Sequence, residues 1–343
     1  MKPCYFIAEI GVNHEGSLER AKQMVIDAKA AGANCVKFQT YKAERLAAKN
    51  SPAYWDRSSE PTSSQYKLFK KFDTFTLADY RELFKLCKNE GIEFLTTPFD
   101  LTAVEEMDEF LNKFKIASAD ITNKPLLEAI ARKEKPVIIS TGASTKEEIS
   151  QALEILTTNG CTDVTLLHCV LNYPTPIASA HMAMMKDLIE NYPSCAMGYS
   201  DHTLPNYPFV ALMQSLMLGG TVIEKHFTYD KSLVGNDHYH AFDKHDLIKF
   251  RKLEADYCMA WGNINEKKPT PHEDDAIAHA RRSIYSNHDI NEGQIITEAD
   301  LIMKRPGNGI SPMFINDIIG KTATRFIPED HQFSLADVYD DKK

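Results

Sequence analysis

Residues 222–228 read VIEKHFT, an apolar stretch that carries three polar side chains, Glu224, Lys225 and His226. Without these three, the stretch is typical of a buried β-strand. Side chains two residues apart in a strand point to the same face, so Glu224 and His226 are predicted to lie together and Lys225 to point the other way. Because a carboxylate and an imidazole are costly to bury without partners, this face is predicted to belong to a site, and a metal ion is a natural partner.

A similar arrangement occurs upstream in GYSDHT, residues 198–203, where Ser200 and His202 share a face. Two strands that each end in a polar, histidine-bearing tip indicate a site built at one edge of a sheet.

The surrounding chain alternates short apolar segments with amphipathic helical patterns. Eight segments are predicted to be strands: 5–11, 35–41, 93–99, 114–118, 136–141, 164–170, 195–201 and 221–228. Strands that alternate with helices favour a parallel sheet. Eight such units in roughly 250 residues favour an α/β fold of the closed (β/α)8 TIM-barrel type over an open sheet.

Two regions lie outside this repeat. Residues 45–75 are long for a loop and follow the predicted end of a strand, where long loops usually cover an active site. Beyond residue 262 the chain becomes polar and proline-bearing, and then shows short strands, turns and glycine-bearing corners. We predict a catalytic barrel over residues 1–262, a linker over 263–280 and a small β-rich domain over 281–343.

Composition limits the classes of partner. The chain has 343 residues and a formal net charge of −9, and no basic stretch is long enough to follow a nucleic-acid backbone. Its seven cysteines form no CxxC pair, so buried free thiols are expected. The N-terminus lacks a signal-peptide core, and no apolar run has membrane-spanning length. We therefore predict a cytoplasmic protein that binds neither nucleic acid nor membranes.

Polar residues gather near the C-terminal ends of the predicted strands, where barrels of this kind have their active sites. Taken singly, each also fits a structural role: a strand lysine can reach the rim, a histidine can be a hydrogen-bonded core residue, and Glu9 can pair with Lys37. Their joint placement favours a site, because a purely structural barrel would have branched apolar residues in these layers.

These residues also sort by chemistry. The donors that a phosphate or carboxylate anion needs are Lys37, Lys115, Ser118, Ser140 and Ser200. His202 and His226 offer two neutral nitrogen ligands to a divalent ion and leave positions open for water or a substrate oxygen. The candidate acids and bases are Glu9, Asp120, Asp201 and Glu224. The pattern predicts a pocket for an anionic substrate beside an open metal, suited to polarising a carbonyl.

Eight motifs then make a resemblance recognisable: AEIGVNHEGS (8–17), VKFQTY (36–41), KIAS (115–118), IISTGA (138–143), LHC (167–169) with YPTP (173–176), GYSDHT, VIEKHFT and KRPGNG (304–309). In this order and spacing they resemble the sialic acid synthase family, also called N-acetylneuraminate or nonulosonic acid synthases. The resemblance runs from about residue 5 to the C-terminus.

The resemblance implies a barrel with a C-terminal antifreeze-like (SAF) domain. It implies a transferase that condenses phosphoenolpyruvate with an N-acylated 2-amino-sugar, releases phosphate and requires Mn²⁺ or Mg²⁺. By this resemblance, the sugar would be N-acetylmannosamine or a diacetamido-deoxyhexose.

Roles for single residues also follow from the resemblance. His202 and His226 would bind the metal, and the two lysines and three serines would hold phosphoenolpyruvate. Glu9, Gln39, Tyr173 and Asp237 would lie around the sugar. Arg305 would reach the sugar's N-acyl group from the partner subunit of a domain-swapped homodimer. Glu9, Asp120 and Glu224 are the candidate catalytic carboxylates, and Glu224 would either position the sugar or orient the metal's surroundings.

The chain departs from the family pattern in two places. The segment SADITN (118–123) has Asp120 where many bacterial members have a glutamate. Between LHC and YPTP, where several relatives have a polar residue, this chain has Val170, Leu171 and Asn172. Two alternatives stay open: a related synthase that condenses phosphoenolpyruvate with an aldose phosphate, and a non-catalytic protein that binds sugars or anions.

Overall fold

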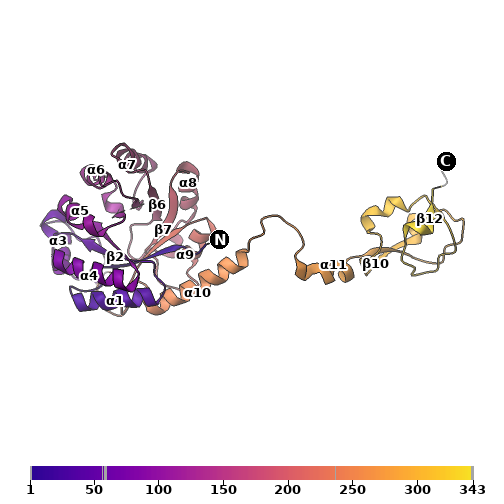
Figure 1. Cartoon of the computed structure of the whole chain (residues 1–343), viewed down its shortest axis with the longest axis horizontal. Helices are drawn as coiled ribbons and strands as arrows, with labels where there is room; N and C mark the ends of the chain where they lie inside the picture. The colour runs from indigo at the N-terminus through magenta and orange to yellow at the C-terminus, as the bar shows by residue number, and fades with distance from the viewer. Residues whose placement is uncertain (1, 56, 58–59, 236, 341–343) are drawn as a thin grey trace. The chain divides into compact units, whose positions relative to one another are not determined.

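Eight parallel strands form the sheet of the N-terminal part, in the order β3-β2-β1-β8-β7-β6-β5-β4. Their bounds are β1 (Tyr5–Gly11), β2 (Cys35–Thr40), β3 (Glu93–Pro98), β4 (Phe114–Ile116), β5 (Val137–Ser140), β6 (Val164–Cys169), β7 (Ala196–Asp201) and β8 (Val222–His226). The two ends of this order, β3 and β4, also lie against each other. The sheet therefore curves into a nearly closed barrel, as Figure 1 shows, and the predicted (β/α)8 fold is confirmed.

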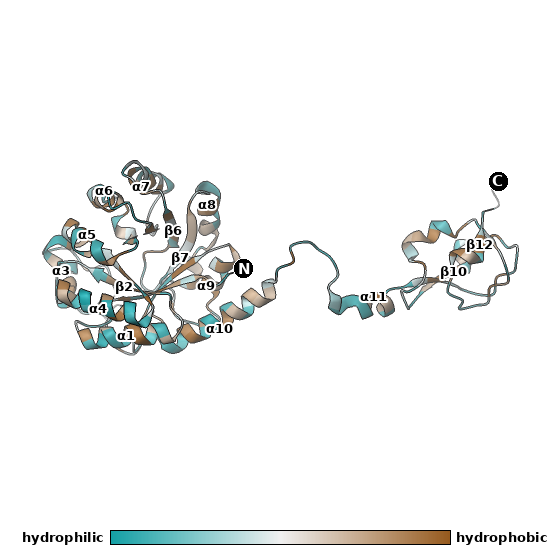
Figure 2. Cartoon of the chain, viewed as in Figure 1, coloured by the Kyte–Doolittle hydropathy of each residue, from teal (hydrophilic) through white to brown (hydrophobic). Residues whose placement is uncertain are grey.

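Helices surround this sheet. They are α1 (Leu18–Ala30), α2 (Ala43–Leu46), α3 (Gln65–Phe72), α4 (Leu77–Glu90), α5 (Leu101–Met107), α6 (Lys124–Ala131), α7 (Lys146–Thr158), α8 (Ala183–Asn191), α9 (Val210–Met217) and α10 (Lys244–Trp261). In α1, Ala21, Met24, Val25 and Ala28 are buried, which is the three-to-four-residue spacing of one helix face. Figure 2 shows hydrophobic strands in the middle of the barrel and helices of mixed hydropathy around them.

Strand register brings polar residues to one level of the barrel. Glu9 of β1 pairs with Lys37 of β2 on one side and with His226 of β8 on the other. Ser200 of β7 pairs with Glu224 of β8. Because neighbouring strands are in register at their C-terminal ends, residues far apart in the sequence share one small volume.

The computed structural model describes residues 2–55, 57, 60–235 and 237–340. It divides into two compact units, Met1–Gly262 and Asn263–Lys343. The second unit contains α11 (Asp274–Ala280) and two antiparallel pairs: β9 (Ser283–Ser286) with β10 (Leu301–Lys304), and β11 (Thr322–Ala323) with β12 (Val338–Tyr339). It has a core of its own, built on residues such as Ile284, Ile290 and Phe333.

All seven cysteines are free thiols, as predicted, and five of them are buried, whereas Cys195 and Cys258 are half-buried. None of the helices in the described part of the chain combines the length and the apolar character that crossing a lipid bilayer requires.

Gly198 lies where β7 packs tightly between its neighbours β6 and β8. A Cβ atom on Gly198 would lie 2.2 Å from the Val222 carbonyl oxygen and 2.6 Å from Leu167 Cδ2. We therefore expect Gly198→Ala to lower the free energy of unfolding by about 1–3 kcal/mol, measured by chemical denaturation. The control is Ala196→Ser at the exposed start of the same strand, which should change it by less than about 0.5 kcal/mol. Equal stability of Gly198→Ala and wild type would contradict this register.

Candidate active site

A cavity of about 440 Å³ lies at the C-terminal ends of the strands. All the residues predicted for the site line it except Asp201 and Arg305: Glu9, Lys37, Gln39, Lys115, Ser118, Asp120, Ser140, Tyr173, Ser200, His202, Glu224, His226 and Asp237. Arg305 follows β10 in the second unit, and its place at an N-acyl group stays a prediction.

Glu224 lies between two buried lysines at the base of this cavity. Its Oε2 is 3.9 Å from Lys37 Nζ and its Oε1 is 3.7 Å from Lys115 Nζ. Ser200 Oγ donates a hydrogen bond of 3.0 Å to the same carboxylate. Burial would raise the pKa of Glu224, but Lys115 and Lys37 together hold it below its ordinary value. Glu224 is therefore ionised at neutral pH and is a shared counter-charge for both lysines.

The two lysines differ in their surroundings. Lys115 Nζ donates to Ser140 Oγ at 2.7 Å and to the Ile116 carbonyl oxygen at 2.9 Å, and burial lowers its pKa although Glu224 opposes the shift. Burial also acts to lower the pKa of Lys37, but Glu224 and Glu9 outweigh it and raise the pKa. Both ammonium groups point at the same cavity, where an anion can bind them with little further desolvation.

Glu9 is the second carboxylate of this cluster. Its Oε2 lies 2.5 Å from Lys37 Nζ, and Gln39 Nε2 donates to its Oε1 at 2.9 Å. Burial raises the pKa of Glu9 to about 7 against the lowering effect of Lys37. A carboxyl group that titrates near neutrality suits general acid–base catalysis. When Glu9 is protonated, the two lysines outweigh Glu224 and the cluster carries net positive charge.

The two predicted metal-binding histidines lie beside this cluster. Their ring centres are 5.4 Å apart. His202 Nδ1 lies 2.8 Å from the Val170 carbonyl oxygen, an arrangement that places the ring proton on Nδ1 and leaves Nε2 as the acceptor. Burial lowers the pKa of His202 to about 4 and that of His226 well below its ordinary value. Both rings are therefore neutral at pH 7, the form that binds metal ions.

Two further side chains complete a potential metal-binding group with His226. Asp237 Oδ2 lies 3.7 Å from His226 Nδ1. Ligand atoms of His226, Asp237 and His240 lie within 4.8 Å of one another, so these residues fit a divalent ion. The sequence analysis did not predict His240 as a ligand, because it belongs to no strand. The signal was the second histidine in HYH, residues 238–240.

The structure places the two predicted carboxylates Asp120 and Asp201 differently. Asp120 lies in a short 3₁₀ turn that lines the cavity, accepts a hydrogen bond of 3.0 Å from Asn123 Nδ2, and has its pKa raised by burial. Asp201 is instead 2.6 Å from Lys225 Nζ, and neither residue lines the cavity. Lys225 thus points away from the site as predicted, whereas the assignment of Asp201 as a candidate acid or base is wrong because its carboxylate neutralises Lys225.

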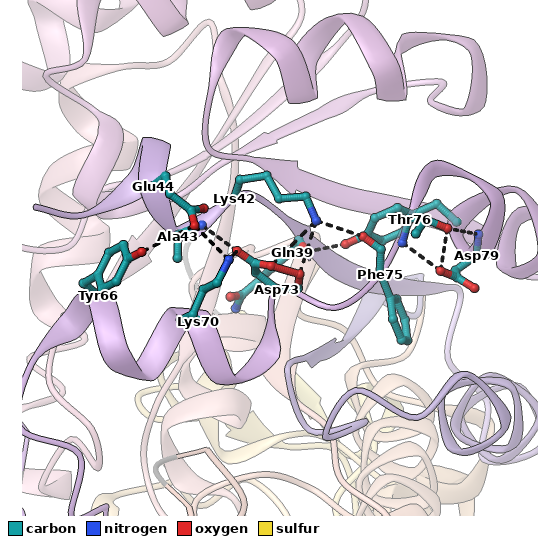
Figure 3. Close-up of polar contacts among 11 residues, drawn as sticks. Gln39, Lys42, Ala43, Glu44, Tyr66, Lys70, Asp73, Phe75, Thr76 and Asp79 are labelled. Atoms are coloured by element: carbon teal, nitrogen blue, oxygen red, sulfur yellow. Dashed lines mark hydrogen bonds and ion pairs between the residues drawn. The ribbon is translucent and has the colours of Figure 1, made fainter. Parts of the chain in front are cut away.

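Residues 45–75 contribute an aromatic wall to the cavity. Tyr54, Trp55, Phe69 and Phe72 all line it. The base of this segment is fixed by Asp73, which Figure 3 shows among its partners. Asp73 Oδ2 accepts a hydrogen bond of 2.9 Å from the Ala43 backbone N–H. These residues of the segment therefore form one wall of the active-site cavity.

Three comparisons place this site in a family. The pattern of the NeuB family matches residues 24–266, and that of the SAF domain matches residues 281–338. The chain is 38% identical to an N,N'-diacetyllegionaminic acid synthase of Campylobacter jejuni, over 96% of this chain and 98% of that protein. It is also 38% identical to an N,N'-diacetyllegionaminic acid synthase of Legionella pneumophila, over 92% and 89%.

Among solved structures, an N-acetylneuraminic acid synthetase from Leptospira borgpetersenii, in complex with citrate, is 30% identical with a TM-score of 0.69, covering 80% of this chain and 90% of that one. The fold and the charged, histidine-bearing cavity are consistent with an enzyme, and the relatives define its class as a transferase-type acid synthase. The chain belongs to the NeuB family of sialic-type acid synthases and carries a SAF domain.

The Asp73 contact leads to a prediction about the 45–75 segment. Replacing Asp73 with Ala leaves the Ala43 N–H without its acceptor, which costs about 1–3 kcal/mol locally if that group stays buried. Asp73→Asn keeps an acceptor and loses mainly ion pairs to Lys42 and Lys70, which contribute little when exposed. Limited proteolysis should cut Asp73→Ala within residues 45–72 several-fold faster than wild type, and Asp73→Asn at nearly the wild-type rate. Equal rates for all three would contradict this role.

The raised pKa of Glu9 leads to a pH-dependent prediction. The pKa of Glu9 is about 7 in the folded chain and about 4.3 in the unfolded chain. Between these values the folded chain holds the proton more tightly, so the free energy of unfolding falls as pH rises from about 4.3 through 7. Glu9→Gln lacks this titration. Thermal melts should therefore show Glu9→Gln gaining stability relative to wild type between pH 5 and pH 8. Exposed Glu147→Gln is the control and should show no such trend. A constant difference between Glu9→Gln and wild type would refute the shift.

Proposed function

We propose that this chain condenses phosphoenolpyruvate with an N-acylated 2-amino-sugar to form a nine-carbon 2-keto acid and inorganic phosphate. The observation that carries the proposal is the buried Lys37–Glu224–Lys115 arrangement in one cavity with His202 and His226. Two lysines and three serines supply the donors that a carboxylate and a phosphate require. The relatives named as diacetyllegionaminic and N-acetylneuraminic acid synthases support the same reaction type.

In the proposed mechanism, Lys37 and Lys115 hold the phosphate and carboxylate and offset their charge throughout. A divalent ion, Mn²⁺ or Mg²⁺, would be held by the histidines and would supply Lewis-acid polarisation of the sugar's open-chain aldehyde. The C2=C3 π electrons of phosphoenolpyruvate form a bond to the aldehyde carbon, and the aldehyde π electrons go to its oxygen, which takes up a proton. Water then adds to the cationic carbon 2. The resulting tetrahedral centre collapses with cleavage of its C–O bond to phosphate. Glu9, whose pKa burial raises to about 7, would accept a proton from that water.

The outer wall of the cavity favours an uncharged, acylated sugar over a phosphorylated one. It presents Tyr54, Trp55 and Phe72. Lys71 also lines it, but its Nζ is 3.0 Å from the Glu60 carboxylate. An apolar wall with a neutralised cation suits acetamido and deoxy groups and offers little to a second phosphate. We therefore propose 2,4-diacetamido-deoxyhexoses as the preferred substrates, with N-acetylmannosamine as the simpler candidate.

The proposed assembly is a homodimer in which Arg305 of the partner subunit contacts the N-acyl group. Support for this comes from the resemblance of the KRPGNG motif to the family pattern.

The proposal is tested by phosphate release from phosphoenolpyruvate with a panel of mono- and di-N-acylated sugars and Mn²⁺. Release should require both the sugar and the metal. Lys115→Met should lower kcat/KM by at least about 100-fold, because a charge-assisted contact to a buried anion is lost. Lys124→Met, at an exposed lysine outside the cavity, is the matched control and should retain activity.

No turnover with any sugar of the panel would contradict the proposed reaction. Preference for a phosphorylated aldose would support the alternative synthase instead. Binding of phosphoenolpyruvate and sugar without turnover would support the non-catalytic alternative.

A further inference from the structure

We propose that His240 is an additional protein ligand of the metal ion, so that the centre favours divalent transition ions over Mg²⁺. The inference rests on the proposed function only in taking this ion to be the one that the synthase uses. It concerns a residue outside the strands and outside the motifs that carry the family resemblance.

The geometry places His240 against the other ligands. Its side chain is fully buried, and its ring centre lies 4.8 Å from that of His226. Ligand atoms of His240, His226 and Asp237 all lie within 4.8 Å of one another. Three evenly spaced ligand atoms that lie about 2.1 Å from a shared ion are at most about 3.6 Å apart. A shift of about 0.7 Å or less in each side chain is therefore enough to bind an ion.

Backbone hydrogen bonds between Phe242 and the end of β8 hold His240 in this place. The Phe242 N–H donates to the His226 carbonyl oxygen at 2.7 Å, and the Thr228 N–H donates to the Phe242 carbonyl oxygen at 2.8 Å. The described residues between Thr228 and Phe242 thus lead away from β8 and return beside it. Because Phe242 is fixed next to His226, a residue two positions earlier is held at the same edge of the cavity.

His226 differs from the structural histidines of the chain in its hydrogen bonding. His168 Nε2 bonds to the Ala180 carbonyl oxygen, and His238 Nδ1 bonds to Thr228 Oγ1, both at 2.8 Å. His226 Nδ1, by contrast, is buried without a hydrogen-bond partner, and the Asp237 carboxylate lies 3.7 Å away. A buried polar atom without a partner is costly, and a cation between it and a carboxylate removes that cost.

Ligand type sets the expected selectivity. Imidazole nitrogens suit transition ions, whereas Mg²⁺ prefers oxygen ligands and keeps several waters. Adding His240 to His226 therefore increases affinity for ions such as Co²⁺, Mn²⁺ and Zn²⁺ more than affinity for Mg²⁺. Asp237 supplies one negative charge, which serves either kind of ion.

The test is metal binding by the full chain in the absence of substrates. Co²⁺ and Mn²⁺ are titrated into metal-free wild type, His240→Asn and His238→Asn, with calorimetry and the visible absorption of Co²⁺ as readouts. Loss of an outer-shell partner already weakens metal binding by about 10–100-fold, so loss of a direct ligand in His240→Asn should cost at least about tenfold. His238→Asn is the matched control, a buried histidine of the same loop that bonds to Thr228, and should stay within about threefold of wild type.

Mg²⁺, measured by competition, should lose less affinity than Co²⁺ in His240→Asn. Thermal melts of the metal-free chains check that each variant is folded. If His240→Asn does not fold, ¹⁵N resonances of the wild-type imidazoles on Zn²⁺ loading give the second readout. The resonance of His240 should shift by a metal-bound amount while that of His168 stays in place.

Affinity in folded His240→Asn within threefold of wild type, or an unshifted His240 resonance under saturating Zn²⁺, would overturn the inference. The result is separable from the proposed function. Turnover with wild-type metal affinity in His240→Asn contradicts only the ligand role, whereas His240-dependent metal binding without turnover contradicts only the synthase.

Discussion

The structure of the site depends on one buried carboxylate, Glu224, that holds two lysine side chains in the interior of the barrel. Removing ionised groups from water costs several kcal/mol each, so Lys37 and Lys115 stay charged only with a shared partner nearby. Glu224 supplies it from β8, within 4 Å of both ammonium groups. When Glu9, the second carboxylate beside Lys37, is protonated, Glu224 alone cannot balance two lysines, and the remaining positive charge is available to a bound anion.

The strand register of the barrel keeps this balance and places a potential metal-binding group beside it. Register sets Glu9 level with both Lys37 and His226, so the second carboxylate adjoins the charge cluster and the metal-binding group. Because burial raises the pKa of Glu9 to about 7, the net charge of the cluster changes with pH near neutrality. The proposed sites for anion binding, proton transfer and the metal thus share one volume.

Much of this arrangement was predictable from the sequence, because strand period and strand ends are local properties. The two-residue period separated Glu224 and His226 from Lys225, and polar strand tips located the cavity. What the sequence could not supply were contacts set by tertiary structure. The two-residue period also sets Asp201 apart from Ser200, but its ion pair with Lys225 of the neighbouring strand is such a contact. His240 reaches the metal-binding group only because a loop returns to pair beside β8.

The most direct measurement of the central claim is calorimetric titration of phosphoenolpyruvate into wild type, Lys37→Met and Lys115→Met. If the two buried lysines form the anion site, wild type binds phosphoenolpyruvate and each substitution weakens binding by at least about 100-fold, with the fold retained. Undiminished binding in both folded variants, or no binding to wild type, would contradict the account.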